Sequence, residues 1–238
     1  MTDFADIWSY LSSGPLMWLT ATLAAYAIGD ACFRAAGRSP LANPVLIAVA
    51  LLAGLLHFSG TPYPVYFEGA QFVHFLLGPA TVALALPLFD TLPRLRRAFL
   101  PALAALIVGS ATAALSALAI ASAFGVSGEV LASLAAKSAT APVAIGISQG
   151  IGGSPTLTAV LVILTGITGA VVATPLLNLL RIRDWRARGF AVGVTSHGIG
   201  TARAFQVNPT AGAFAGLGMA LNAIATALIA PLALSLFQ

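Results

Sequence analysis

The stretch Ser196-His197-Gly198-Ile199-Gly200 repeats the pattern of an earlier stretch, Ser148-Gln149-Gly150-Ile151-Gly152. A long apolar segment follows each stretch, and the two segments carry prolines at matching places, Pro175 and Pro231. Inside a membrane, glycine-rich breaks are tolerated only where protein or a polar cavity satisfies the freed backbone groups. The two stretches therefore predict two broken or re-entrant elements that form an inverted repeat.

The composition indicates that the rest of the chain lies in a lipid bilayer. Hydrophobic residues make up 59% of the 238 residues and charged residues only 8%, and the mean hydropathy is +0.96. A soluble domain carries roughly 25% charged residues. We therefore expect one all-α integral membrane domain over residues 1–238, with scaffold-like segments in 1–125 and the paired repeats in 126–238. The sequence contains no basic patch interleaved with aromatic residues, so it does not predict nucleic-acid binding.

About eight apolar segments are expected, because a helix needs about 20 residues to cross the hydrocarbon core. Glycine and proline interrupt several of them. The predicted segments are 14–28, 41–58, 72–89, 99–124, 130–151, 157–180, 190–205 and 212–237.

The basic residues predict the topology, because short cytoplasmic loops collect Lys and Arg. Nine of the 11 fall in three groups. All three groups should therefore lie on the cytoplasmic side. Two apolar segments separate the first and second groups, which returns the chain to the same side. Three segments separate the second and third groups, so one of these three must fail to cross. Segment 130–151 is the best candidate, because it contains Lys137 and Pro142. The groups are Arg34 and Arg38; Arg94, Arg96 and Arg97; and Arg181, Arg183, Arg186 and Arg188.

The two remaining basic residues, Lys137 and Arg203, lie inside the suspected broken elements. A buried cation in a membrane is costly and implies a partner or a task. Because no acidic residue lies deep in a predicted segment, the partner could be an anionic substrate, which helix N-termini at the breaks would also favour. The alternative is that both side chains reach the lipid headgroups from segment ends.

Hydroxyl, amide and imidazole groups surround the two cations and could line a hydrated cavity, although close helix packing also favours small and hydroxylated residues. His197 could hydrogen-bond a carboxylate or accept a proton. A Ser196–His197 nucleophile has no acid to orient the ring, so we expect no enzyme. Cys32 is the only cysteine, and no metal or cofactor motif is present. The predicted substrate-binding residues are Lys137, Ser138, Thr140, Gln149, Gly150, Ser196, His197, Gly198, Gly200, Thr201 and Arg203.

Four motifs, in order, resemble the LrgB family, also called CidB-like, and the membrane part of the plant plastidal glycolate/glycerate translocator. They are Leu77-Gly78-Pro79-Ala80-Thr81-Val82-Ala83-Leu84-Ala85; Lys137-Ser138 through Pro142; Ile151-Gly152-Gly153; and Ser196-His197-Gly198-Ile199-Gly200-Thr201-Ala202-Arg203.

The resemblance implies a secondary transporter of small monocarboxylates such as glycolate, glycerate or pyruvate. Its alternative implication is an antiholin-like regulator of murein hydrolase export and cell lysis, acting with a small LrgA-like membrane partner. By analogy we expect a homodimer. Because no plastid targeting extension is present, we expect a multi-pass protein of a bacterial inner membrane. Relatives often carry a glutamate where this chain has Gln206, so proton coupling, if present, would use another group such as His197 or Glu129.

Overall fold

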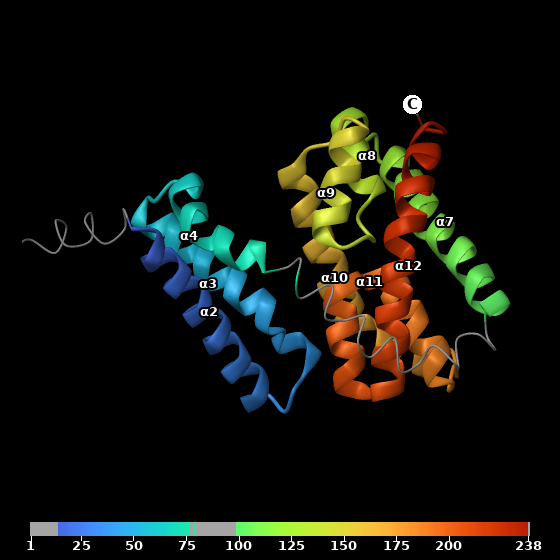
Figure 1. The fold of residues 1–238 in the computed structure, drawn as a ribbon, viewed down its shortest axis with the longest axis horizontal. Coiled ribbons are helices and arrows are strands. Elements are labelled where there is room, and N and C mark those ends of the chain that lie inside the picture. Colours follow the sequence, from blue (N-terminus) through green and yellow to red (C-terminus); the bar gives the residue numbers. More distant parts are fainter. Residues whose placement is uncertain (1–13, 77–78, 80–98, 238) are drawn as a thin grey trace, which may run out of the picture. The chain divides into compact units, whose positions relative to one another are not determined.

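A computed structural model describes residues 14–76, 79 and 99–237, and within these residues the regular structure is entirely helical. The chain divides into two compact units, Met1–Ala83 and Leu84–Gln238. Figure 1 shows the helices of each unit. The motif at 77–85 lies outside the described residues except for Pro79.

The described part of the N-terminal unit contains three helices and a 3₁₀ turn. Ala25, Ala48 and Leu52 form its small buried core, with Tyr66 packed against them. Asn43 caps the second helix, because its Oδ1 accepts a hydrogen bond from the Val45 backbone N–H at 2.9 Å. The last helix lies where the sequence predicted no separate segment. The elements are α2 (Pro15–Ala35), η1 (Pro40–Ala42), α3 (Pro44–Ser59) and α4 (Tyr63–Phe75).

The C-terminal unit contains six described helices. In the first of them, Leu106 packs with Phe190 and Phe214 in one cluster, which joins this helix to the last two. The helices are α7 (Phe99–Ala123), α8 (Gly128–Ala135), α9 (Ala141–Gly150), α10 (Pro155–Leu179), α11 (Trp185–Val207) and α12 (Pro209–Leu234).

Four described helices, α2, α7, α10 and α12, are long and apolar enough to cross a membrane. Helix α3 is apolar but shorter. Most of the predicted segment 72–89 lies outside the described residues. The chain is thus an all-helical membrane protein with four candidate spans among its described residues, where the sequence predicted about eight apolar segments.

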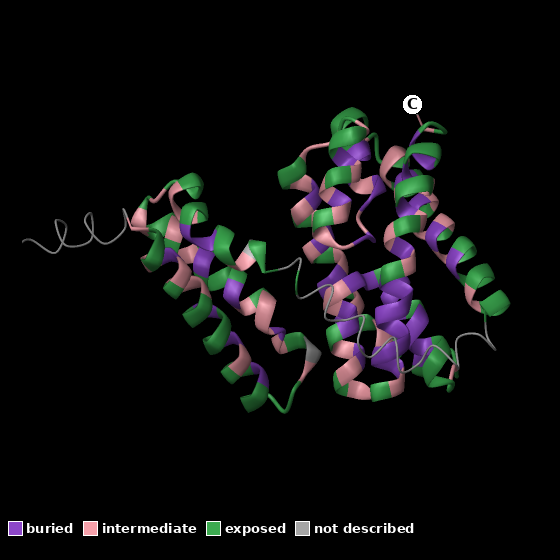
Figure 2. Ribbon diagram, in the orientation of Figure 1, coloured by how far each residue is buried: buried purple, intermediate pink, exposed green. Residues whose placement is uncertain are grey.

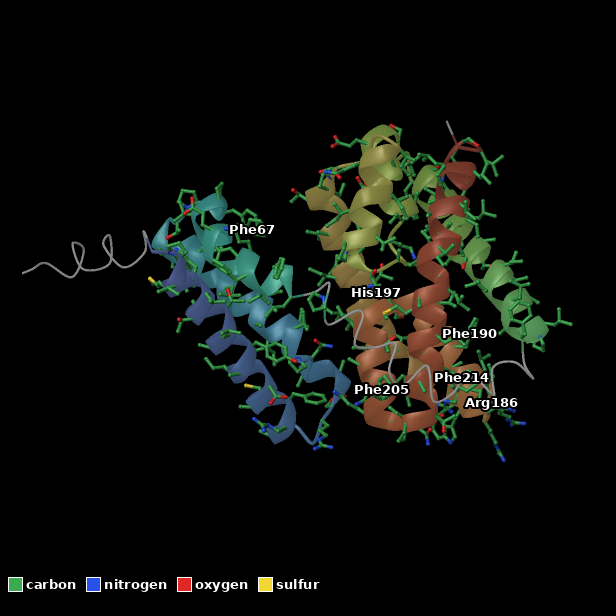
Figure 3. The ribbon with its side chains drawn as sticks, in the orientation of Figure 1. Phe67, Arg186, Phe190, His197, Phe205 and Phe214 are labelled. Atoms are coloured by element: carbon green, nitrogen blue, oxygen red, sulfur yellow. The ribbon has the colours of Figure 1, made fainter. Side chains whose placement is uncertain are left out.

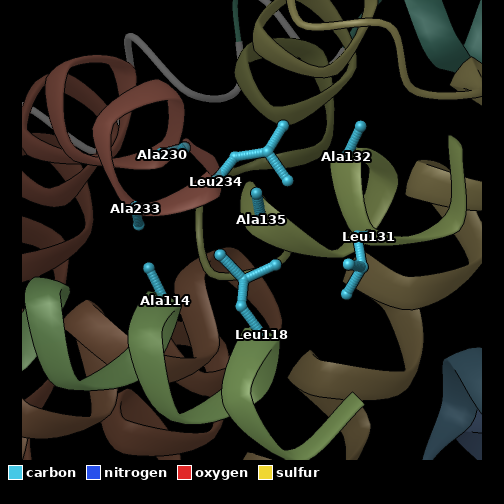
Figure 4. Packing of buried hydrophobic residues seen from close by; sticks show 8 residues of the cluster. All are labelled: Ala114, Leu118, Leu131, Ala132, Ala135, Ala230, Ala233 and Leu234. Carbon is cyan, nitrogen blue, oxygen red and sulfur yellow. The ribbon is translucent and has the colours of Figure 1, made fainter. Parts of the chain in front are cut away.

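The predicted segment 130–151 forms two short helices, α8 and α9, joined by residues 136–140. At 1.5 Å per residue neither helix alone reaches across the hydrocarbon core. Helix α8 is anchored by Leu131, Ala132 and Ala135, which pack against the C-terminal ends of α7 and α12 (Figure 4). The segment therefore consists of two partial helices that belong to one end of the unit.

Helix α11 is broken at His197, whose backbone has φ 40° and ψ −134°. A non-glycine residue in this conformation costs on the order of 1–3 kcal/mol, which the surrounding packing must offset. The chain reverses there, because Val192 before the break and Ala204 after it meet in one cluster. Both arms, 185–196 and 198–207, pack against the N-terminal half of α12. There α12 is buried on every side from Ala211 to Met219 (Figure 2).

Helices α10 and α12 run in opposite directions. Leu177, near the end of α10, packs with Ala211 and Ala215 at the beginning of α12. Figure 1 shows α8 and α9 beside the C-terminal end of α12, and α11 beside its N-terminal half. The repeated sequence stretches do not occupy equivalent places in this arrangement, because residues 148–150 end α9 whereas residues 196–200 contain the break in α11.

Candidate functional site

A groove lies between α7 and α10 and reaches the linker 136–140 and the end of the first arm of α11. Its volume is about 820 Å³. Among the lining residues that the structure describes, Lys137 is the only charged one, and none is Asp or Glu. The polar residues that line it with Lys137 are Thr112, Ser116, Ser138, Thr165, Thr168, Thr195 and Ser196.

Lys137 and Ser138 reach this groove from the linker between α8 and α9. The Lys137 Nζ donates a hydrogen bond to the Ser138 Oγ at 3.2 Å. The Ser138 carbonyl oxygen accepts from the Asn222 Nδ2 at 3.0 Å, and the Asn222 Oδ1 accepts from the Ser110 Oγ at 2.5 Å. Helices α7 and α12 are thereby both connected to the segment that carries the cation.

The His197 side chain is placed against α10 rather than in the groove lining. Its ring is buried, and the Nε2 lies 2.8 Å from the Val162 carbonyl oxygen. Because a carbonyl only accepts, this nitrogen must carry the proton and donate it. Gly166 permits the approach, since a Cβ at this position would lie 2.6 Å from the His197 Cε1. Figure 3 shows His197 away from the end of the unit where Arg186 lies.

Arg203 lines a separate, smaller hollow together with Arg188 and Trp185. This hollow has a volume of about 20 Å³, close to the space of one water molecule. The Arg203 Nη1 donates to the Gln206 Oε1 at 3.2 Å. Because Gly169, Ala173, Leu177 and Val192 line both spaces, the hollow adjoins the groove. The two cations that the sequence placed in one site therefore line neighbouring spaces.

Arg188 was grouped with the loop arginines, but the structure buries it in α11. Its guanidinium donates to the Asn178 Oδ1 at 2.8 Å and to the Ile182 carbonyl oxygen at 3.1 Å. It also lies 4.7 Å from the centre of the Trp185 ring. Arg188 thus donates hydrogen bonds to acceptors at the C-terminal end of α10. The sequence did not predict this role, because Arg188 stands next to a group of charged loop residues.

The other predicted site residues are dispersed around the two broken elements. Thr140 precedes α9, whereas Gln149 and Gly150 lie at its far end, about 15 Å along the helix. Gly200 packs against Val192, and the Thr201 Oγ1 donates to the His197 carbonyl oxygen at 2.7 Å. Gly198 is partly buried beside Met219. Of the predicted residues, only Lys137, Ser138 and Ser196 line the groove.

Sequence reasoning missed Asn222 and the hydrogen bonds within a second group of buried polar residues. Asn222 is fully buried in α12. The sequence did contain a signal for it, because an amide side chain in the middle of an apolar segment is costly to bury without a hydrogen-bond partner. The second group joins α8, α9 and α10: the Thr158 Oγ1 donates to the Ser148 Oγ at 2.6 Å, and the Ser154 N–H donates to the Ser133 Oγ at 2.8 Å.

These features define an α-helical membrane protein with broken helices around a polar, cation-containing groove. The chain belongs to the LrgB-like family, whose profile matches residues 22–236. The uncharacterised protein YwbG of Bacillus subtilis is 37% identical, over 81% of this chain and 86% of its own. An uncharacterised protein of Haemophilus influenzae is 34% identical, over 82% and 84%. The holin-like protein CidB of Staphylococcus aureus is 31% identical, over 84% and 87%. No solved structure matches the chain significantly.

Proposed function

We propose that the chain is a secondary transporter of small monocarboxylates across a bacterial inner membrane. The observation that carries the proposal is the groove, whose described lining residues combine one cation, Lys137, with several hydroxyl groups and include no acidic residue. The hydroxyl groups could donate hydrogen bonds to a carboxylate, and Lys137 would supply the opposite charge. The groove is far larger than a small organic acid needs, whereas the hollow beside Arg203 is too small for one.

In this proposal Ser138, Thr195 and Ser196 complete the carboxylate site with Lys137. The His197 ring holds the end of the first α11 arm against α10, and Arg203 adds positive charge next to the groove. No enzymatic step is part of the proposal.

Alternating access would use an inverted repeat, with α8, α9 and α10 as one half and α11 and α12 as the other. Two features support this arrangement. Helices α10 and α12 run in opposite directions, and a broken element precedes each. The break in each element contacts the long helix of the other half, through His197 with Val162 and Ser138 with Asn222. Transporters built from inverted repeats place their substrate sites where such elements meet.

The second candidate function is a holin-like or antiholin-like role in cell lysis, acting with a small LrgA-like membrane protein. It is favoured by the similarity to the holin-like protein CidB of Staphylococcus aureus. A carrier and a pore differ in kinetics, because a carrier saturates with substrate and a pore does not. A homodimer is compatible with either function.

Uptake of labelled glycolate, glycerate and pyruvate into proteoliposomes tests the proposal. We expect saturable uptake of at least one of them, and a loss of at least about tenfold in kcat/KM for Lys137→Ala, the cost expected for one charge-assisted hydrogen bond. Arg186→Ala is the matched control, because Arg186 is exposed and paired with Asp184. Absence of saturable uptake of all three acids would refute the transporter proposal, and non-saturable leakage would favour the lysis-related function.

A further inference from the structure

We propose that Asn222 is a positioning residue that fixes the linker 136–140 and so holds Lys137 and Ser138 in the groove. Its effect on transport rests on the proposed function, but its effect on the linker does not. Asn222 itself is absent from the groove lining, so it would act through Ser138 rather than on a substrate.

Both ends of the Asn222 amide are used. The residue has no exposed surface, its Nδ2 donates to the Ser138 carbonyl oxygen at 3.0 Å, and its Oδ1 accepts from the Ser110 Oγ at 2.5 Å. The first bond joins α12 to the linker, and the second joins α12 to α7. One side chain in the middle of α12 therefore connects three elements that are far apart in the sequence.

The linker depends on such a contact because it is not helical throughout. Residues 136–138 form a turn after α8, residue 139 forms a bend and residue 140 has no regular structure, so the Ser138 carbonyl oxygen is outside any helix ladder. A buried carbonyl away from water requires a hydrogen-bond donor. Ala136 and Ala139 pack against Ala144 and Val162 on one side of the linker. Those apolar contacts do not select one rotation of the peptide, whereas the directional bond from Asn222 does.

The position of the Lys137 Nζ follows from this bond. Lys137 precedes Ser138 in the chain, and its Nζ donates to the Ser138 Oγ. A change in the Ser138 peptide would therefore move both the cation and the hydroxyl that it contacts. Because Asn222 lies on α12, a movement of α12 relative to α10 would change the position of Lys137 in the groove.

The first test measures the position of the linker without any substrate. Lys137→Cys is introduced into a Cys32→Ser background, which leaves one cysteine, and its rate of reaction with a membrane-impermeant thiol reagent is measured in detergent. Asn222→Leu removes both hydrogen bonds at similar volume. Asn222→Ala also removes both hydrogen bonds, with a side chain smaller than leucine that cannot clash with the linker. We expect either substitution to change the labelling rate by at least about fivefold, because the tether is lost.

Ser110→Ala is the matched control, because it removes the other bond of Asn222 and leaves the one to Ser138. We expect its labelling rate to stay within about twofold of the parent. If Asn222→Leu does not fold, Asn222→Ala alone decides. Labelling rates that match the parent in every folded Asn222 variant would overturn the proposal.

The second test is uptake into proteoliposomes by proteins that retain Lys137. A positioning role predicts that Asn222→Ala raises KM by about tenfold and changes the maximal rate less, whereas Ser110→Ala changes neither appreciably. If the Asn222 variants change the labelling rate but the unmodified chain shows no uptake, the positioning role of Asn222 would stand and the transporter function would be rejected. Equal KM values for the Asn222 variant and the unmodified chain would count against positioning at the substrate site.

Discussion

Gly166→Ala should separate α10 from the break in α11 by a predictable amount. The added methyl group would lie 2.6 Å from the His197 Cε1 and 2.9 Å from the Ile199 Cβ. Carbon atoms in ordinary contact are about 3.5–4.0 Å apart, so the end of the first α11 arm must retreat by about 1 Å. The 2.8 Å separation between the His197 Nε2 and the Val162 oxygen would then exceed the normal range of a hydrogen bond.

Two costs follow from that displacement. Overpacking of a well-packed site costs about 1–3 kcal/mol, and an interhelical hydrogen bond in a membrane protein contributes about 1 kcal/mol. We therefore expect Gly166→Ala to lower the free energy of unfolding by about 2–4 kcal/mol. For a chain of this length the midpoint of thermal unfolding in detergent should fall by about 5–15 °C.

The matched control is Gly146→Ala in α9, where an added Cβ would meet no atom within 4 Å. Alanine is the better helix former by about 1 kcal/mol, so this variant should be as stable as the unmodified chain or more so. Equal unfolding midpoints for the two variants would refute the close contact between α10 and His197.

Three further predictions concern charged and polar groups near α11. Arg188→Ala should lower the free energy of unfolding by about 2–4 kcal/mol because buried acceptors lose their donor, whereas Arg186→Ala should stay within about 0.5 kcal/mol; denaturant titrations in detergent compare them. Gln206→Glu should raise KM for an anionic substrate about twofold in uptake assays, because the new carboxylate would offset the positive charge of Arg203. Over roughly 10 Å between the carboxylate and the substrate, in a medium close to water, the repulsion is about 0.4 kcal/mol. A hydrogen bond from the Arg186 side chain lowers the pKa of Asp184 to about 2, below the value of about 3.9 in unfolded chains. The ionised Asp184 carboxylate therefore contributes fully to the free energy of unfolding above about pH 4, and this contribution is lost as the pH falls toward 2. The difference in the free energy of unfolding between the unmodified chain and Asp184→Asn should shrink as the pH is lowered over that range.

Some residues of the candidate site could be singled out from the sequence and others could not, for reasons that differ from residue to residue. A lone lysine in an apolar segment indicates a task whatever the fold, and Lys137 does line the groove. Arg203 gave the same signal, but the chain reversal at His197 places it beside a different space. Arg188 gave the opposite signal, because its neighbours in the sequence are exposed charges while its neighbours in space are carbonyl groups.

The order of amino acids is enough to predict the helical, membrane-embedded character of the chain, its membership of a family, and the two regions where long helices fail. These properties are local or additive, because they depend on composition, on runs of apolar residues and on where glycine and proline occur. Which polar groups meet depends on the packing of the helices. This packing turned the His197 ring toward Val162, joined Asn222 to Ser138, and brought Lys137 into one groove with Thr195 and Ser196. Those contacts depend on how helices distant in the sequence pack and rotate against one another. The short repeated stretches did not predict that packing, because they occupy different places in it.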